Sequence, residues 1–145
     1  MNKYTITRVL IILALVFTSL GYEKAFSDSA EGKKASDVYL EFLTSAQKAS
    51  SFGDISSYWA GWMAESFDRG SDEQKAARFE RIKKSANDKK DVNVVSTEKS
   101  GEFWVLNLSS VYPDGQKMKG QVKIIQENGK YLIEEEMWTA DFSDE

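Results

Sequence analysis

The chain has 145 residues and contains neither cysteine nor histidine. It therefore lacks the thiolate and imidazole ligands of ordinary zinc sites and the side chains of Ser-His-Asp and Cys-His nucleophiles. It carries 19 basic and 23 acidic residues, and its formal net charge of −4 at pH 7 disfavours nucleic acid or an anionic membrane as a partner. We expect no metal site and no cofactor.

Residues 1–27 have the outline of a secretory signal peptide. Lys3 and Arg8 precede an apolar run from Val9 to Leu20, and small residues follow. The apolar run is short for a membrane-spanning helix, which needs about 20 residues. We therefore expect cleavage and a periplasmic or secreted domain without membrane attachment; a retained N-terminal anchor is the alternative.

The first part of the remaining chain has a helical pattern. Small polar residues at 28–34 predict a flexible mature N-terminus. Apolar residues at spacings of three and four then predict a helix over about 35–50 and a second helix over about 55–67. The second helix has a heavy aromatic stripe that includes Trp59 and Trp62, and we expect this stripe to pack on a sheet.

A third helix and a sheet follow. Ser71 to Gln74 forms a capping-box pattern, which predicts that a helix starts there and runs to about Asn87. Beyond it the apolar period changes to two, which predicts strands over 91–98, 102–112, 116–126 and 130–139. Pro113-Asp114-Gly115 and Asn128-Gly129 are strong turn signals between these strands.

This order of elements predicts an α+β domain over residues 35–139. Short connections between strands favour antiparallel neighbours, and helices must cover one face of such a sheet. We expect three N-terminal helices packed on a curved four-stranded antiparallel sheet. Residues 140–145 form an acidic tail that we expect to fray.

The chain resembles the NTF2-like (cystatin-like) superfamily, and within it the small exported bacterial domains of unknown function. The resemblance depends on the order of the pieces and on three segments of the sheet: Tyr112-Pro113-Asp114-Gly115, Lys119-Gly120-Gln121-Val122-Lys123-Ile124 and Glu127-Asn128-Gly129-Lys130-Tyr131-Leu132-Ile133. It implies a cone-shaped domain with a pocket between sheet and helices. Enzymatic relatives use such a pocket for isomerisation or dehydration, but no motif here carries a catalytic residue over.

Several large aromatic side chains are candidates for lining a pocket, since aromatic walls with a few polar groups are typical of small-molecule sites. The alternative is that they form an ordinary core. The candidates are Tyr58, Trp59, Trp62, Trp104, Tyr112 and Tyr131, with Trp138 as a further possibility.

One carboxylate is a weak catalytic candidate. Strand alternation places Tyr131, Ile133 and Glu135 on one face, so Glu135 would face the helices if its two neighbours do. A partly desolvated carboxylate there could act as an acid or base. The alternative is that Glu135 pairs with a lysine or is solvated.

Three functions are compatible with this sequence. The first is a noncatalytic exported binding or accessory domain for a small apolar ligand or an envelope protein. The second is a small NTF2-like enzyme of the isomerase or dehydratase type that uses a cavity carboxylate. The third is a structural module that dimerises through the open face of its sheet.

Overall fold

The computed structural model describes residues 29–143, so the predicted signal peptide at residues 1–27 lies outside the described residues. Three helices precede a four-stranded antiparallel sheet, which confirms the predicted α+β class. The elements are α2 (Ala30–Lys48), the short 3-10 helices η1 (Phe52–Asp54) and η2 (Ser56–Tyr58), α3 (Gly61–Asp68), α4 (Asp72–Asp88), β1 (Lys90–Ser100), β2 (Phe103–Val111), β3 (Lys117–Glu127) and β4 (Lys130–Ala140).

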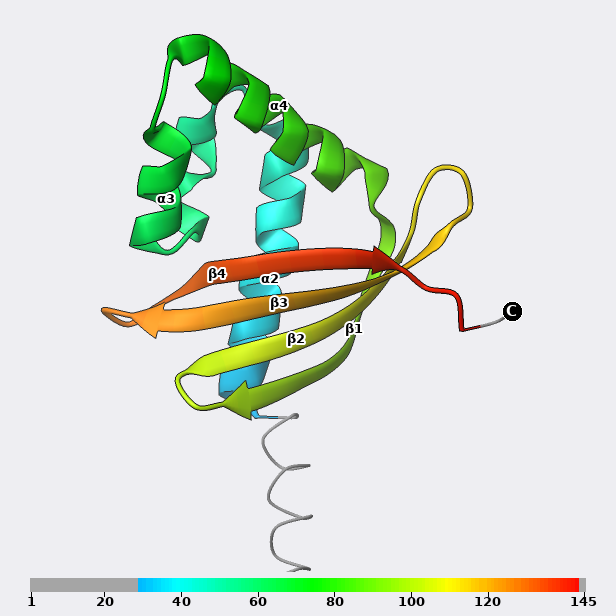
Figure 1. Cartoon of the computed structure of the whole chain (residues 1–145). Coiled ribbons are helices and arrows are strands. Elements are labelled where there is room, and N and C mark those ends of the chain that lie inside the picture. The colour runs from blue at the N-terminus through cyan, green and yellow to red at the C-terminus, as the bar shows by residue number, and fades with distance from the viewer. Residues whose placement is uncertain (1–28, 144–145) are drawn as a thin grey trace, which may run out of the picture.

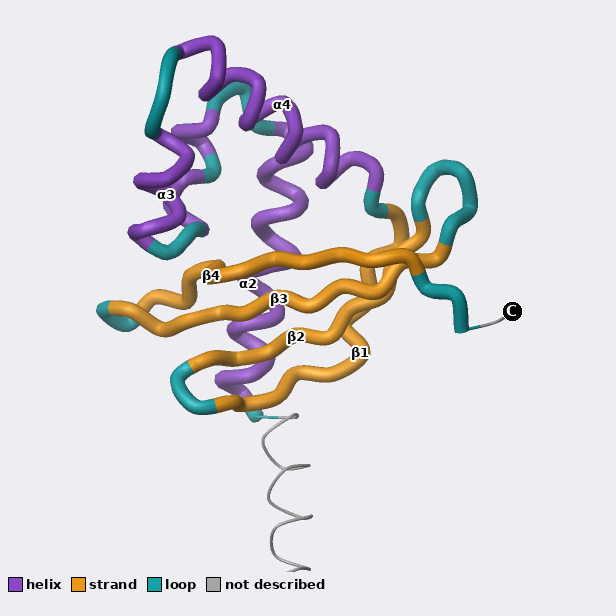
Figure 2. The backbone as a smooth tube through the Cα atoms, viewed as in Figure 1, coloured by secondary structure: helices purple, strands orange, loops and turns teal. Residues whose placement is uncertain are grey.

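The sheet has the simple order β1-β2-β3-β4, so β1 and β4 are its edges. Figure 1 shows the long helix α2 crossing one face of the curved sheet, with α3 and α4 beyond the β4 edge. The tube view in Figure 2 shows the same arrangement of helices and strands. The core lies between α2 and the sheet, and its largest fully buried side chains include Tyr39, Phe42, Trp104 and Leu106.

The helix α2 begins earlier than the sequence pattern predicts. Ser29 is its N-cap, and the Ser29 hydroxyl accepts a hydrogen bond of 3.1 Å from the Gly32 amide. Residues 30–34 are therefore helical, so the prediction of a flexible segment is wrong for them. Burial of Gly32 and Ala35 shows that this first turn already contacts the rest of the domain.

The predicted second helix over 55–67 is interrupted. Two short 3-10 turns lead to Trp59, whose backbone is extended, and to the non-helical Ala60, and only then does α3 begin. Trp59 forms a parallel bridge with Ile133 of β4, and the Ala60 amide donates to the Ile133 carbonyl at 2.9 Å. The Ile133 carbonyl on the open edge of β4 thus gains a hydrogen-bond donor that a continuous helix could not supply.

This interruption corrects the expectation for the aromatic stripe. Trp59 is buried with 6% of its surface exposed, whereas Trp62 is 54% exposed. An uninterrupted helix would have placed both indoles on nearly the same face. Because the chain leaves the helical path at Trp59, Trp62 is mostly exposed, and the prediction that the stripe packs on the sheet is wrong for Trp62.

The local signals in the second half of the chain are confirmed. Ser71 and Gln74 form the predicted capping box at the start of α4. Asn128 and Gly129 both have positive φ, 51° and 77°, as a tight type I′ hairpin turn requires. The register of β3 and β4 follows from this turn as far as the Ile124–Ile133 pair.

The beginning of the acidic tail is held to the sheet. The Asp141 amide donates to the Lys117 carbonyl at 2.8 Å, and Lys119 Nζ lies 2.8 Å from the Asp141 carboxylate. The hydrogen bond from Lys119, with help from Ser143, lowers the pKa of Asp141 to about 2. Asp141 is therefore held in place, and the expectation that the acidic tail frays is wrong at this residue.

A pair of substitutions tests the interrupted helix. We expect Trp59→Ala to lower the free energy of unfolding by about 3–5 kcal/mol, because it removes a buried aromatic side chain. Trp62→Ala should cost less than about 1 kcal/mol, because Trp62 is mostly exposed. Urea denaturation followed by circular dichroism measures both, and equal losses would show that the two indoles are buried alike.

Candidate functional site

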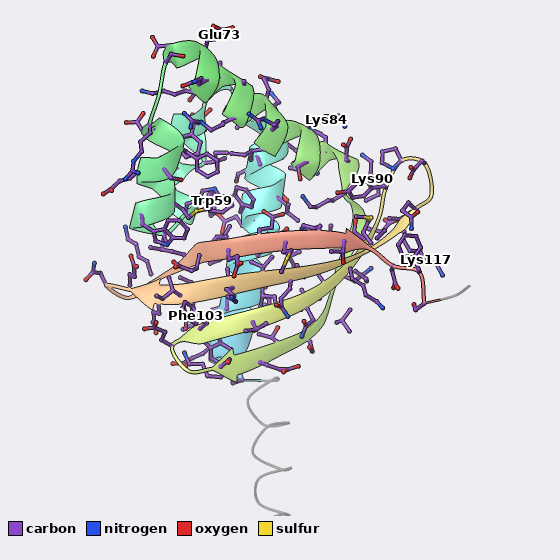
Figure 3. All side chains as sticks on the ribbon, in the orientation of Figure 1. Trp59, Glu73, Lys84, Lys90, Phe103 and Lys117 are labelled. Carbon is purple, nitrogen blue, oxygen red and sulfur yellow. The ribbon has the colours of Figure 1, made fainter. Side chains whose placement is uncertain are left out.

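A cavity of about 430 Å³ lies between the helices and the β4 edge of the sheet. Its apolar wall comes from α2, from Trp59, from α3 and from α4, and includes Phe42, Leu43, Trp59, Met63, Phe67 and Ile82. Figure 3 shows Trp59 in the space between α3 and β4. The volume is within the range of about 300–1,000 Å³ typical of small-molecule sites.

The aromatic part of this wall is held by edge-to-face contacts. The Trp59 ring lies 5.2 Å from the Phe42 ring at 83° and 5.5 Å from the Phe67 ring at 64°. Such arrangements bring the positive edge of one ring to the negative face of another. The bridge from Trp59 to β4 fixes the position of the indole, so the wall is preorganised by the same feature that interrupts the helix.

A hydrogen-bonded carboxylate lies at the sheet side of the cavity. Glu136 Oε1 accepts hydrogen bonds of 2.8 Å from the Tyr39 hydroxyl and from Trp138 Nε1. The same oxygen lies 3.1 Å from Lys89 Nζ. We call these four residues, Tyr39, Lys89, Glu136 and Trp138, the Glu136 network; it joins α2, the end of α4 and β4.

The lysine of this network is almost completely buried. Its side chain is 2% exposed and that of Glu136 is 16% exposed. Lys89 Nζ also donates to the Ser85 hydroxyl at 2.5 Å and lies 5.3 Å from the centre of the Trp138 ring. A buried ammonium needs such partners, because its desolvation without them is very costly.

The strand β3 makes room for the indole of the network. Gly120 pairs with Trp138 across the sheet, and a Cβ atom at Gly120 would lie 2.7 Å from the Trp138 ring. A larger residue would have to push the indole away from Glu136. The absence of a side chain at Gly120 thus allows the Trp138 ring to pack against β3.

The network is better suited to support than to proton transfer. Burial, followed by the charge of Glu136, raises the pKa of Tyr39 well above its ordinary value, so Tyr39 remains a protonated donor. Two donors and one ammonium converge on Glu136 Oε1 and hold the carboxylate in one orientation. The Glu136 network therefore connects α2, the end of α4 and β4.

Glu135, the predicted weak catalytic candidate, lies on the other face of β4. In the ladder Lys123 pairs with Glu135 but Ile124 pairs with Ile133, so Glu134 is an extra residue in a β-bulge. The bulge shifts the alternation by one, so the expectation that Glu135 shares the face of Ile133 is wrong. Glu135 is 49% exposed and lies 2.5 Å from Lys123 Nζ, which matches the alternative of a lysine pair.

The candidate aromatic residues do not come together at one place. Trp59 lines the 430 Å³ cavity, and so does Trp138. Trp62 lines a separate hollow of about 340 Å³ beside β4, together with Phe103 and Glu134. These two hollows contain Met63 and Glu136 in common.

The remaining candidates lie away from the cavity. Trp104 is 1% exposed and belongs to the core under α2. The Tyr58 hydroxyl hydrogen-bonds to Ser45 at 3.0 Å. Tyr131 packs on the core near the start of α2, and Tyr112 follows β2.

Sequence reasoning missed the polar part of the cavity. Arg78, Arg81 and Lys89 line it from α4 and its C-terminal end. A signal existed for the two arginines, because residues three apart lie on one side of a helix. No local signal could identify Glu136 as the inward carboxylate, because that depends on the bulge.

No protein-family model matches the chain, and comparisons with curated proteins and with solved structures found no match. Within residues 29–143, no cluster of acidic side chains is arranged to hold a metal ion. Among the helices of that range, none combines the length and the apolar character needed to cross a membrane.

Substitution of the two neighbouring carboxylates tests the bulge. Glu136→Gln keeps the size of the side chain but leaves the buried Lys89 ammonium without its counter-charge, so we expect a loss of about 3 kcal/mol in the free energy of unfolding. Glu135→Gln should cost less than about 1 kcal/mol, because its pair with Lys123 is exposed. Urea denaturation of both variants measures this difference, and the reverse order would contradict the bulged register.

Proposed function

We propose that this chain is a noncatalytic binding domain that takes a small apolar ligand into the cavity between α4 and β4. The observation that carries the proposal is a cavity of about 430 Å³ whose walls are mainly aromatic and aliphatic side chains. Filling such a cavity with an apolar molecule removes its surface from water, which is the main source of affinity in sites of this kind.

The polar groups of the cavity favour binding over catalysis. The Glu136 network uses its carboxylate to compensate a buried lysine and to orient Tyr39 and Trp138. Glu135 lies beside Lys123 on the other face of β4. Three donors engage the Glu136 carboxylate and a lysine engages Glu135, and these contacts favour a structural role for both carboxylates over acid or base catalysis.

We also propose that the chain belongs to the NTF2-like superfamily and that it is exported. Three helices before a four-stranded antiparallel sheet, with a cavity between helices and sheet, fit what the resemblance implies. The pattern of residues 1–27 supports export to the periplasm or the medium. A domain of this kind would hold its ligand in the envelope or pass it to another protein.

An uncharged apolar fluorophore tests the proposal. N-phenyl-1-naphthylamine should become brighter on addition of the purified protein, with saturable binding, because the cavity removes it from water. Ile82→Trp adds bulk to the cavity wall and should weaken this binding about tenfold or more. Val95→Trp is the matched control, because Val95 is 69% exposed on β1 and does not line the cavity.

The outcomes separate clearly. Loss of binding in Ile82→Trp, with circular dichroism unchanged and binding retained in Val95→Trp, would support the cavity as the site. Equal binding by the unmodified protein, Ile82→Trp and Val95→Trp would show that the fluorophore binds outside the cavity and would contradict the proposed site. Absence of saturable binding to the unmodified protein would overturn the proposed function.

A further inference from the structure

Two arginines of α4 line the apolar cavity without an acidic partner. Arg78 and Arg81 lie three residues apart, so both reach the same side of the helix. Neither forms an ion pair with a carboxylate among residues 29–143. Cations beside an apolar wall and without a counter-charge favour a ligand that carries a negative charge.

The hydrogen bonds of these arginines are few. Arg78 Nη2 donates to the Arg69 carbonyl, and Arg78 Nε is buried with no hydrogen-bond partner in the described part of the chain. Arg81 Nε donates to the Ala77 carbonyl at 3.3 Å on its own helix. A guanidinium carries five N–H groups, so both side chains retain donors for a ligand.

The other charges of the cavity are already balanced. Lys89 and Glu136 neutralise each other at 3.1 Å. The arginines therefore give the cavity an excess of positive charge, although the whole chain has a net charge of −4. A local positive site in an acidic protein favours a small anion over a large anionic surface such as a membrane or a nucleic acid.

We propose that the cavity binds an apolar carboxylate, with a hydrocarbon chain of the fatty-acid type against the aromatic wall and its carboxylate at Arg78 and Arg81. This inference depends on the proposed function and adds the chemical class of the ligand. The planar guanidinium matches the geometry of a carboxylate and can form two parallel hydrogen bonds to it. The apolar wall of Phe42, Trp59, Met63 and Phe67 suits an unbranched chain or a ring system.

Isothermal titration calorimetry with two matched probes tests this inference. Dodecanoate and dodecanol share the same chain and differ in the head group, and both are used at concentrations below aggregation. The unmodified protein should bind dodecanoate about ten- to a hundredfold more tightly than dodecanol, since hydrogen bonds to charged groups contribute that much. Added salt should reduce this preference.

Substitutions in α4 test whether the two arginines cause the preference for dodecanoate over dodecanol. Arg78→Gln combined with Arg81→Gln should bring the ratio of the dodecanoate and dodecanol affinities close to one, because the charged head group loses its partners. Arg81→Gln alone, at an exposed position, should reduce the preference in part and protects the test if the double variant does not fold. Lys84→Gln is the control, because Figure 3 shows Lys84 on the outside of α4 and it does not line the cavity.

Each result decides between the two proposals. Loss of the preference in the arginine variants, with Lys84→Gln unchanged, supports a carboxylate ligand. Equal affinity for the two probes, or a preference that survives in the double variant, overturns the carboxylate inference and leaves apolar binding intact. No binding of either probe by the unmodified protein overturns the apolar-cavity proposal and the carboxylate inference together.

Discussion

The arrangement of this domain depends on the ion pair between Lys89 and Glu136. Lys89 follows the last turn of α4 and is 2% exposed, so its ammonium requires a counter-charge inside the protein. Glu136 supplies this charge from the edge strand β4 and also accepts a hydrogen bond from Tyr39 of α2. One carboxylate thus fixes two helices relative to the sheet, and the cavity lies among these elements.

Two irregular features of the β4 edge shape the rest of the site. The bulge at Glu134 turns Glu136 inward and Glu135 outward. The bridge from Trp59 to Ile133 interrupts the helical path and brings the Trp59 indole into the cavity wall. Both features lie at neighbouring positions of one edge strand, where unpaired backbone groups are free to take irregular partners.

The sequence predicts the elements whose signals are local. The capping box at Ser71 and the Asn128-Gly129 turn were identified because the side chains or φ angles that they require belong to a few consecutive residues. The break at Trp59 was not predicted, because the aromatic spacing from Ile55 to Phe67 fits a helix and the competing hydrogen bond comes from β4, far along the chain. In the same way, three consecutive glutamates give no indication of which one faces the helices, and a single extra residue in β4 decides it.

A double-mutant cycle between Lys89→Met and Glu136→Gln tests this account most directly. The free energies of unfolding of the two single variants and the double variant give the coupling between the two side chains. The account predicts a coupling of about 1–3 kcal/mol for this pair and a value near zero for the matched cycle of Lys89→Met with Glu135→Gln. A coupling near zero with Glu136, or a larger coupling with Glu135, would contradict the bulged register and the cavity built on it.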